Sequence, residues 1–257
     1  MNAPLPLQGL GIVITRPRAA AESLAAALAR AGARPFVFPA LAIEPLADPG
    51  ALQESLSRLD AGDVAIFVSA NAVEHGLAAV RRSGSWPSRA RVAAIGDATA
   101  AALRNSGFAA VISPRERHDS EGLLALDELK AVDGRNILIF RGQGGRELLR
   151  EALESRGAHV TYVECYRRTR PQGDPAALLR AWAAGEIQAV SVLSAETLEN
   201  FVAMIGAEGG ARLASTALVV PHEAIASRPP AKRFARVIVA PPDDGMVGAL
   251  AALRTSR

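Results

Sequence analysis

The sequence has little of what builds disulfide frameworks, thiolate metal sites and membrane spans. Cys165 is the single cysteine among 257 residues, so no internal disulfide can form and zinc sites with several thiolate ligands are excluded. No run reaches the ~20 uninterrupted apolar residues that cross a bilayer. Residues 1–6 do not join a basic segment to an apolar one, so no signal peptide is predicted. We expect a cytoplasmic protein that does not bind a membrane.

Lysine and tyrosine are scarce as well. Lys130 and Lys232 are the only lysines, and arginine supplies the rest of the 29 basic residues, although the net charge is only +3. Arginine binds carboxylate or phosphate through two parallel hydrogen bonds better than lysine does, but the base composition of the genome explains this bias equally well. No basic run is interleaved with aromatic side chains, which argues against nucleic-acid binding.

The motifs of common hydrolases, nucleotide-binding proteins and metalloenzymes are missing too. The sequence has neither the Gly-x-Ser-x-Gly pattern of a nucleophile elbow nor the Gly-x-x-x-x-Gly-Lys-[Ser/Thr] pattern of a phosphate-binding loop. Cys165 lies in an apolar strand and is expected to be a buried thiol rather than a nucleophile. The four histidines lack the spacing of metal ligands: His75, His118, His159 and His222. We expect no metal, no cofactor, and chemistry that depends mainly on holding the substrate.

What the sequence does contain is an internal repeat with an offset of 125 residues. Three pairs of segments carry it: 11–16 and 136–141, 66–70 and 191–195, and, with a slip of one residue, 92–96 and 217–221. Each segment reads as a short β-branched strand that leads through a tight turn into a helix. Alternating strands and helices form parallel sheets with helices on both faces. The prediction is an α/β fold of two similar doubly wound parallel-sheet domains that arose by duplication.

Two segments rich in proline and glycine are predicted to be turns or linkers between these parts. Residues 39–49 contain three prolines, and residues 167–175 contain Pro171, Gly173 and Pro175. In the first repeat, Pro17 is expected to be the first helical residue, where its missing N–H costs nothing.

Ligands of open α/β sheets bind at the carboxyl ends of the strands, where helix N-termini present free N–H groups. Residues 139–147 run from a strand into a glycine-rich turn that carries Arg141, Gly142, Gly145 and Arg146, which predicts an anion site. Two alternatives stay open. One is a plain structural turn, and the other is a dinucleotide site, although the spacing is not Gly-x-Gly-x-x-Gly.

Three further strand-to-helix turns have small polar residues at the same position. Ser69 and Ser194 are expected to be helix N-caps, which does not prevent their turns from binding an anionic ligand. The third turn holds Gly96 and Thr99, and Thr99 either faces the ligand or caps its helix.

Several short motifs then occur in a fixed order along the chain: residues 13–17, 67–73, 94–103, 120–124 and 141–149. The most specific one leads from Gly157 and Ala158 through Val160 and Val163 to the Tyr-Arg-Arg sequence at residues 166–168. With these motifs in this order, the chain resembles the uroporphyrinogen-III synthase family over nearly its full length.

This resemblance implies a reaction, a shape and a set of partners. The substrate would be hydroxymethylbilane, and the enzyme, a cyclising lyase of tetrapyrrole biosynthesis, would release water and invert the last pyrrole ring (ring D) to give uroporphyrinogen III. The chain would be bilobed. We expect a monomer, because neither repeat shows an unexplained apolar surface stripe, with transient contact to hydroxymethylbilane synthase. Residues 1–39 and 171–257 would form the first domain and residues 44–166 the second, joined by connectors at 39–43 and 166–170.

The resemblance also implies a site. Tyr166 matches the family's tyrosine in the cleft between the domains and is predicted to assist departure of the substrate hydroxyl. The predicted substrate-binding residues are Arg16, Ser69, Ala70, Asn71, Gly96, Thr99, Arg141, Gly142, Gly145, Arg146, Ser194, Ala195, Glu196 and His222. The arginines could instead form structural ion pairs.

The chain departs from the family pattern at residues 225–234, where Pro229 and Pro230 are predicted to shorten or kink a helix. Two other functions stay open on the sequence. One is a non-catalytic binder or sensor of a small anionic ligand, and the other is a sugar- or phosphoribosyltransferase, against which the absent phosphate-loop and acidic metal motifs argue.

Overall fold

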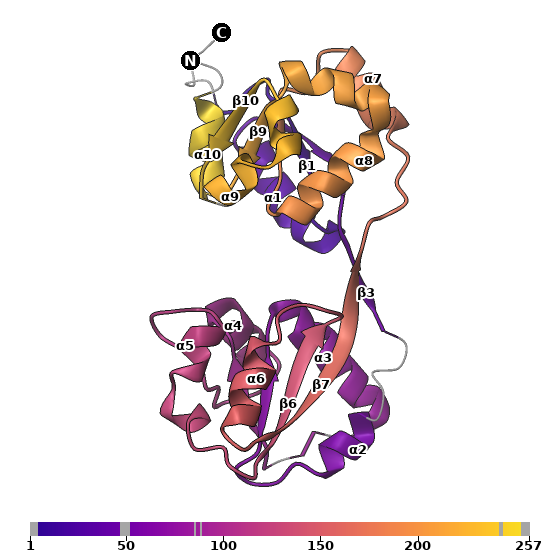
Figure 1. Cartoon of the computed structure of the whole chain (residues 1–257). Coiled ribbons are helices and arrows are strands. Elements are labelled where there is room, and N and C mark those ends of the chain that lie inside the picture. Colours follow the sequence, from indigo (N-terminus) through magenta and orange to yellow (C-terminus); the bar gives the residue numbers. More distant parts are fainter. Residues whose placement is uncertain (1–4, 47–51, 85, 88, 242–243, 253–257) are drawn as a thin grey trace. The chain divides into compact units, whose positions relative to one another are not determined.

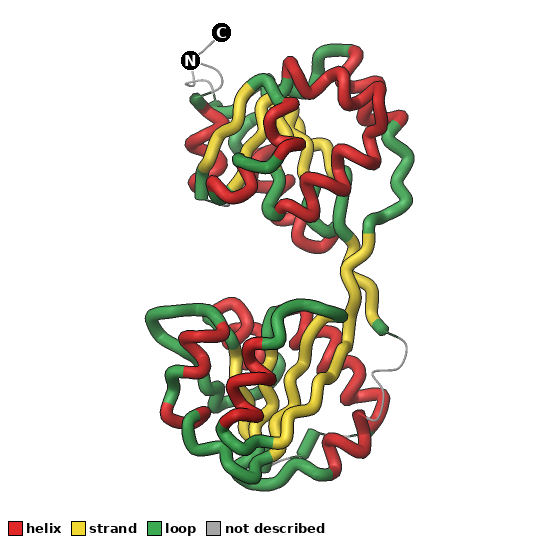
Figure 2. Tube along the Cα trace, viewed as in Figure 1, coloured by secondary structure: helices red, strands yellow, loops and turns green. Residues whose placement is uncertain are grey.

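The computed structural model describes residues 5–46, 52–84, 86–87, 89–241 and 244–252. The chain divides into two compact units (Figure 1). Unit 1 consists of Met1–Ala42 and Thr169–Arg257, and unit 2 of Ile43–Arg168. Each unit is built on a five-stranded sheet with helices packed around it (Figure 2). The predicted α/β fold with two parallel-type sheets is confirmed.

The sheet of unit 1 has the strand order β10-β9-β8-β1-β2, and all neighbouring strands are parallel. Its strands are β1 Gly11–Ile14, β2 Arg34–Val37, β8 Ala189–Ser191, β9 Ala217–Val220 and β10 Arg236–Val239. Its helices are α1 Arg18–Arg30, α7 Ala176–Ala183, α8 Ala195–Arg212, α9 Glu223–Ala226 and α10 Asp244–Ala251, with 3₁₀ helices η2 Leu213–Ser215 and η3 Pro229–Arg233.

The sheet of unit 2 has the strand order β3-β7-β6-β4-β5, and β7, β6, β4 and β5 run parallel. Its strands are β3 Ala42–Pro45, β4 Val64–Phe67, β5 Arg91–Ala94, β6 Asn136–Gly142 and β7 His159–Thr169. Its helices are α2 Leu52–Ser57, α3 Ala70–Ser83, α4 Asp97–Asn105, α5 Ser120–Leu124 and α6 Leu148–Ser155, with the 3₁₀ helix η1 Asp127–Leu129.

Both sheets are buried on both faces, which is why their central strands are short aliphatic runs rather than alternating ones. Successive side chains point to opposite faces. In unit 1, Val13 packs in the layer of α7 and α8, and Ile14 packs in the layer of α1 and α10. In unit 2, Phe140 packs with α2, α3 and α4, and Ile139 packs with α5 and α6. Each unit therefore has three layers, with the sheet in the middle.

The strand pairings show how the repeat is distributed over the two units. In unit 1, β1 of the first repeat pairs with β8 of the second, with Ile14 beside Ser191. In unit 2, β6 of the second repeat pairs with β4 of the first, with Phe140 beside Phe67. Each unit therefore joins the opening strand of one repeat to the later strands of the other.

Three local expectations need adjustment. Pro17 lies one residue before α1 as its N-cap residue and is not the first helical residue. The segment expected to be a linker from residue 167 begins as strand, because β7 continues to Thr169. Of the other expected linker, residues 42–45 form β3, and residues 47–49 lie outside the described residues.

The shortening expected near residues 225–234 is confirmed. α9 has four residues, whereas its counterpart in the first repeat, α4, has nine. Pro229 and Pro230 start η3 instead, because proline lacks the N–H that would continue the α-helix.

The paired phenylalanines of unit 2 give a test of this core. Phe67 and Phe140 are fully buried and their rings stack with centroids 4.4 Å apart. Replacing Phe140 with alanine should lower the free energy of unfolding by about 3–5 kcal/mol, because it leaves a cavity at the centre of the sheet. Urea denaturation followed by circular dichroism measures this. Leu5→Ala, at a side chain 48% exposed, is the control and should change it by less than about 0.5 kcal/mol. Equal effects would contradict the packing described.

Candidate functional site in unit 2

The carboxyl ends of the unit 2 strands surround a hollow of about 190 Å³, which we call the unit 2 hollow. Parallel strands bring these ends to one edge of the sheet, where ligands of open α/β proteins bind. The walls come from the ends of β4, β5, β6 and β7 and from residues 142–147, which we call the glycine turn. They include Val68, Ile95, Ser120, Arg141, Gly142, Gly145, Arg146, Leu149, Tyr162, Tyr166 and Arg168.

Tyr166 lies in β7 with only 2% of its surface exposed. Its hydroxyl oxygen is 3.1 Å from the Oγ of Ser69. Ser69 is the N-cap of α3, and its Oγ accepts a hydrogen bond of 3.0 Å from the N–H of Ala72. A serine hydroxyl has one hydrogen and two lone pairs. The helix N–H occupies one lone pair, so either hydroxyl can donate to the other, and Ser69 donates when the tyrosine hydrogen points elsewhere.

A register shift in β7 decides which face of the sheet Tyr166 occupies. Arg141 pairs with Glu164, and the next residue, Gly142, pairs with Tyr166, so Cys165 is an extra residue in β7. Without this register shift, Tyr166 would follow the two-residue period of Tyr162 and face α5 and α6. With it, Tyr166 packs in the layer that contains α3.

Gly142 provides the space that the ring of Tyr166 occupies. A Cβ atom at this position would lie 2.6 Å from Cε2 and 2.7 Å from Cζ of the ring. Any other residue would therefore push the ring away from Ser69. The main chain is fixed as well, because the N–H of Gln143 donates to the carbonyl of Tyr166 at 2.8 Å.

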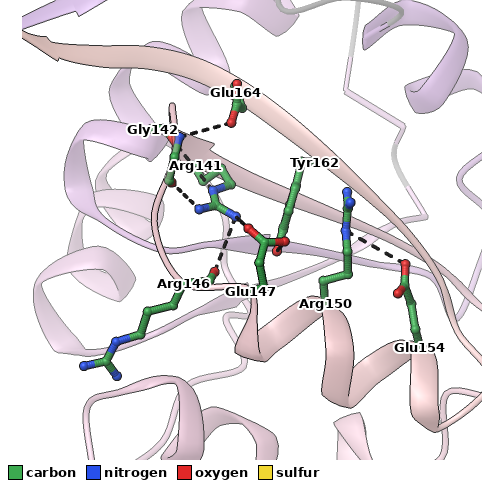
Figure 3. Close-up of polar contacts among 9 residues, drawn as sticks. Arg141, Gly142, Arg146, Glu147, Arg150, Glu154, Tyr162 and Glu164 are labelled. Atoms are coloured by element: carbon green, nitrogen blue, oxygen red, sulfur yellow. Dashed lines mark hydrogen bonds and ion pairs between the residues drawn. The ribbon is translucent and has the colours of Figure 1, made fainter.

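The glycine turn is folded around the side chain of Arg141 (Figure 3). Gly144 and Gly145 have φ angles of +74° and +108°, a region that side chains disfavour. Only 6% of the Arg141 side chain is exposed. Its guanidinium donates to the carbonyls of Gly142, Gly144 and Arg146 and to the Glu147 carboxylate.

Beside the turn, the ring of Tyr162 lies against two guanidinium groups. The Cζ atom of Arg141 is 4.2 Å from the ring centroid and that of Arg150 is 3.8 Å from it. The Tyr162 hydroxyl donates to Oε2 of Glu147 at 2.9 Å. Burial raises the pKa of Tyr162, and the hydrogen bond to Glu147 acts in the same direction.

Sequence comparison identifies the family of the chain. The family model described as Uroporphyrinogen-III synthase HemD matches residues 22–247. The chain belongs to the uroporphyrinogen-III synthase family. The resemblance seen in the order of the short motifs is therefore confirmed.

Individual relatives agree with the family model. The chain is 34% identical to the uroporphyrinogen-III synthase of Escherichia coli (strain K12) over 197 residues, which covers 76% of this chain and 80% of the relative. It is 37% identical to that of Salmonella typhimurium (strain LT2) over 193 residues, which covers 74% and 78%. A crystal structure of a mutant uroporphyrinogen III synthase from Thermus thermophilus has the same fold, with a TM-score of 0.60, 19% identity and coverage of 96% and 98%.

Unit 2 contains most of the residues predicted for the site. Those that line its hollow are Arg141, Gly142, Gly145, Arg146 and Tyr166. Ala70 and Asn71 form the first turn of α3, which Ser69 caps. Gly96 is the N-cap residue of α4, so Thr99 lies inside that helix, 4% exposed, and does not cap it.

The other predicted residues lie at the corresponding strand ends of unit 1. Ser194 caps α8 by accepting a hydrogen bond of 3.1 Å from the N–H of Thr197, and Ala195 and Glu196 form the first turn. Arg16 follows β1 and is half-buried. His222 is the exposed N-cap residue of α9, and its side chain makes no capping hydrogen bond.

Sequence reasoning missed Tyr162, Glu147 and Glu164, which support the glycine turn. Glu164 Oε1 accepts a hydrogen bond of 3.2 Å from the N–H of Gly144. Tyr162 and Glu164 are two residues apart in a strand, so their side chains share one face, opposite Arg141. This spacing was the signal that the sequence offered. Within the described residues, no three His, Cys, Asp or Glu side chains gather into a potential metal site. In the same part of the chain, no helix is both long and apolar enough to cross a membrane.

Cys165 is buried as predicted, with 2% of its surface exposed. Its thiol donates a hydrogen bond of 3.4 Å to the carbonyl of Arg141. Burial raises the pKa of the thiol to about 12. The group is therefore protonated at all pH values near neutrality, and a protonated thiol is a poor nucleophile.

This state of Cys165 can be measured with a thiol reagent. At pH 8 the folded protein should not react with 5,5′-dithiobis(2-nitrobenzoate) within minutes, since the reactive thiolate forms only as the pH approaches the raised pKa. In 8 M urea one equivalent should react at once. Fast labelling of the folded protein, with a midpoint near the ordinary thiol pKa, would show that the thiol is neither buried nor perturbed.

Proposed function

We propose that this chain is the enzyme that closes hydroxymethylbilane to uroporphyrinogen III, with loss of water and inversion of ring D. Family membership supports the reaction. The assignment of the chemistry to Tyr166 rests on one observation. Its hydroxyl lies 3.1 Å from the Oγ of Ser69, beside the unit 2 hollow.

The first step is departure of the substrate hydroxyl. The hydroxyl of Tyr166 donates a hydrogen bond to this group, while Ser69 donates to the oxygen of Tyr166 and keeps the tyrosine hydrogen directed at the substrate. The C–O bond breaks and water leaves with the proton that assists it. The remaining cation is an azafulvene delocalised over its pyrrole ring.

The later steps depend on how the substrate is held. The substituted carbon of the last ring attacks the cation, and the resulting spiro intermediate fragments. Reclosure at the unsubstituted carbon of that ring, with loss of the proton on it, gives the inverted ring and returns the proton used in the first step. Uncatalysed closure gives the uninverted isomer, so orientation of the substrate decides the product. Cys165, protonated and buried, takes no part.

Eight carboxylates on the substrate need many donors, and helix N-termini with glycine-rich turns supply N–H groups for them. In unit 2 we assign this role to the first turn of α3 (Ser69, Ala70 and Asn71), to Gly96 and Thr99 of α4, and to Gly142, Gly145 and Arg146. The same role is proposed in unit 1 for the corresponding residues Arg16, Ser194, Ala195, Glu196 and His222.

The proposal extends to the setting of the reaction. The enzyme acts as a cytoplasmic monomer without a cofactor and receives its unstable substrate in transient contact with hydroxymethylbilane synthase. Residues 39–43 and 166–170 serve as the connectors between two domains formed by residues 1–39 with 171–257 and by residues 44–166.

The reaction is tested by the isomer that the protein makes. Purified protein, supplied with hydroxymethylbilane from hydroxymethylbilane synthase, should give almost entirely uroporphyrinogen III, because the held substrate closes through the spiro intermediate. Oxidation and chromatography of the porphyrins separate the two isomers. If only the uninverted isomer forms, at the rate seen without the protein, while hydroxymethylbilane still raises the melting temperature, the chain is a binder and not the synthase.

The role of Tyr166 is tested by removing its hydroxyl alone. Tyr166→Phe should lower turnover at least tenfold, because a positioned proton donor typically contributes about 10²–10⁴-fold. Its melting temperature should stay near that of the wild type, because the ring that packs against Gly142 is retained. Turnover of the folded variant near the wild-type value would remove Tyr166 from the mechanism.

A further inference from the structure

The guanidinium of Arg141 makes its hydrogen bonds to other groups of the protein. We propose that Arg141 is a positioning residue that holds the glycine turn with its carbonyl groups inward and its N–H groups outward, and in this way sets the affinity of the turn for a substrate carboxylate. The proposal deepens the function given above and rests on it. It differs from the prediction that Arg141 itself binds substrate.

All three nitrogens of the guanidinium have protein acceptors. Nε donates to the carbonyl of Gly142 at 3.3 Å, and Nη2 donates to that of Gly144. Nη1 donates to the carbonyl of Arg146 at 3.4 Å and to Oε1 of Glu147 at 3.2 Å. A carboxylate of the substrate could bind this guanidinium in parallel pairs only by displacing these acceptors. The geometry therefore assigns Arg141 to the turn and not to the ligand.

The direction of the carbonyls fixes the direction of the N–H groups. In a trans peptide the C=O and the N–H of one peptide unit point in opposite directions. The carbonyls of Gly144 and Arg146 point at Arg141, so the N–H groups of Gly145 and Glu147 point away from it. Neither N–H has a hydrogen-bond acceptor among the residues that the structure describes. Two outward N–H groups in a turn, with one residue between them, are donors that suit an anion.

Arg141 is itself held in place on two sides. Its guanidinium lies over the ring of Tyr162 at 4.2 Å, and its charge is paired with Glu147. The carboxylate of Glu147 is held in turn by the hydroxyl of Tyr162 at 2.9 Å. Strand β6, strand β7 and the start of α6 are therefore tied to one buried cation (Figure 3).

Lysine cannot replace arginine in this role. A planar guanidinium reaches acceptors on several sides in one plane, whereas an ammonium is a compact point charge with three donors. Arg141→Lys keeps the charge and should release part of the turn. Arg156→Lys is a matched control, because Nη1 of Arg156 also donates to two main-chain carbonyls, those of Leu124 and Leu129 at 2.9 and 2.7 Å, outside the glycine turn.

The experiment uses the full chain and two readouts. In unliganded protein, hydrogen–deuterium exchange of the hydrogen-bonded N–H groups of Gln143 and Gly144 in the glycine turn should become about tenfold faster in Arg141→Lys and stay unchanged in Arg156→Lys. In steady-state kinetics, Arg141→Lys should raise KM about tenfold with little change in kcat, since binding by the turn is lost while Tyr166 is intact. Arg156→Lys should keep the wild-type KM even if its melting temperature falls.

Each outcome decides a separate question. Unchanged exchange of the turn in Arg141→Lys, or an unchanged KM, would overturn the positioning role, and so would an equal rise of KM in Arg156→Lys. If Arg141→Lys does not fold, Glu147→Gln replaces it, and a rise of about threefold in both exchange and KM is expected from loss of one charged partner. If the wild type itself makes no uroporphyrinogen III, the proposed function fails, and the exchange measurement still decides whether Arg141 holds the turn.

Discussion

The site depends on one steric constraint, the close contact between the ring of Tyr166 and the bare main chain of Gly142. The extra residue Cys165 turns Tyr166 to the face of α3, and the missing side chain at Gly142 lets its ring approach. Only then does the tyrosine hydroxyl reach Ser69, the cap of α3. A strand irregularity and a glycine thus bring the tyrosine hydroxyl to a helix N-terminus, while burial raises the pKa of the Cys165 thiol.

The duplication explains why strands that lead into serine-capped helices occur in both units. Each unit takes its opening strand from one repeat and its later strands from the other, so equivalent strand ends carry equivalent caps, such as Ser69 and Ser194. The copies have since diverged. In unit 2 the capping serine, Ser69, is hydrogen-bonded to a tyrosine, whereas in unit 1 Ser194 is hydrogen-bonded to Thr197. The helix after β9 is reduced to four residues by the prolines that follow it. The glycine turn of β6 has no glycine-rich counterpart after β1, where Arg16 is followed by proline.

Much of the fold was predictable from the sequence, because short aliphatic runs and caps such as Ser69 depend on local chemistry, and the 125-residue offset shows that the same pattern occurs twice. The site was predictable only in part. The face that Tyr166 occupies depends on a pairing register, which is a property of two strands and not of one. The role of Arg141 depends on burial and on carbonyl directions in a turn with two glycines at positive φ, and neither is visible in the residue order. Substrate binding was predicted for Arg141, but the acceptors of its hydrogen bonds were not.

Gly142 leaves room for the ring of Tyr166, and a double-mutant cycle on turnover tests whether the reaction needs that room. Gly142→Ala alone should slow turnover about as much as loss of the tyrosine hydroxyl does, because it displaces the ring. In a Tyr166→Phe background the same alanine should have less than about a twofold further effect, since no hydroxyl is left to displace. If the two losses instead multiply, Gly142 and Tyr166 act independently, and the ring contact does not serve the reaction.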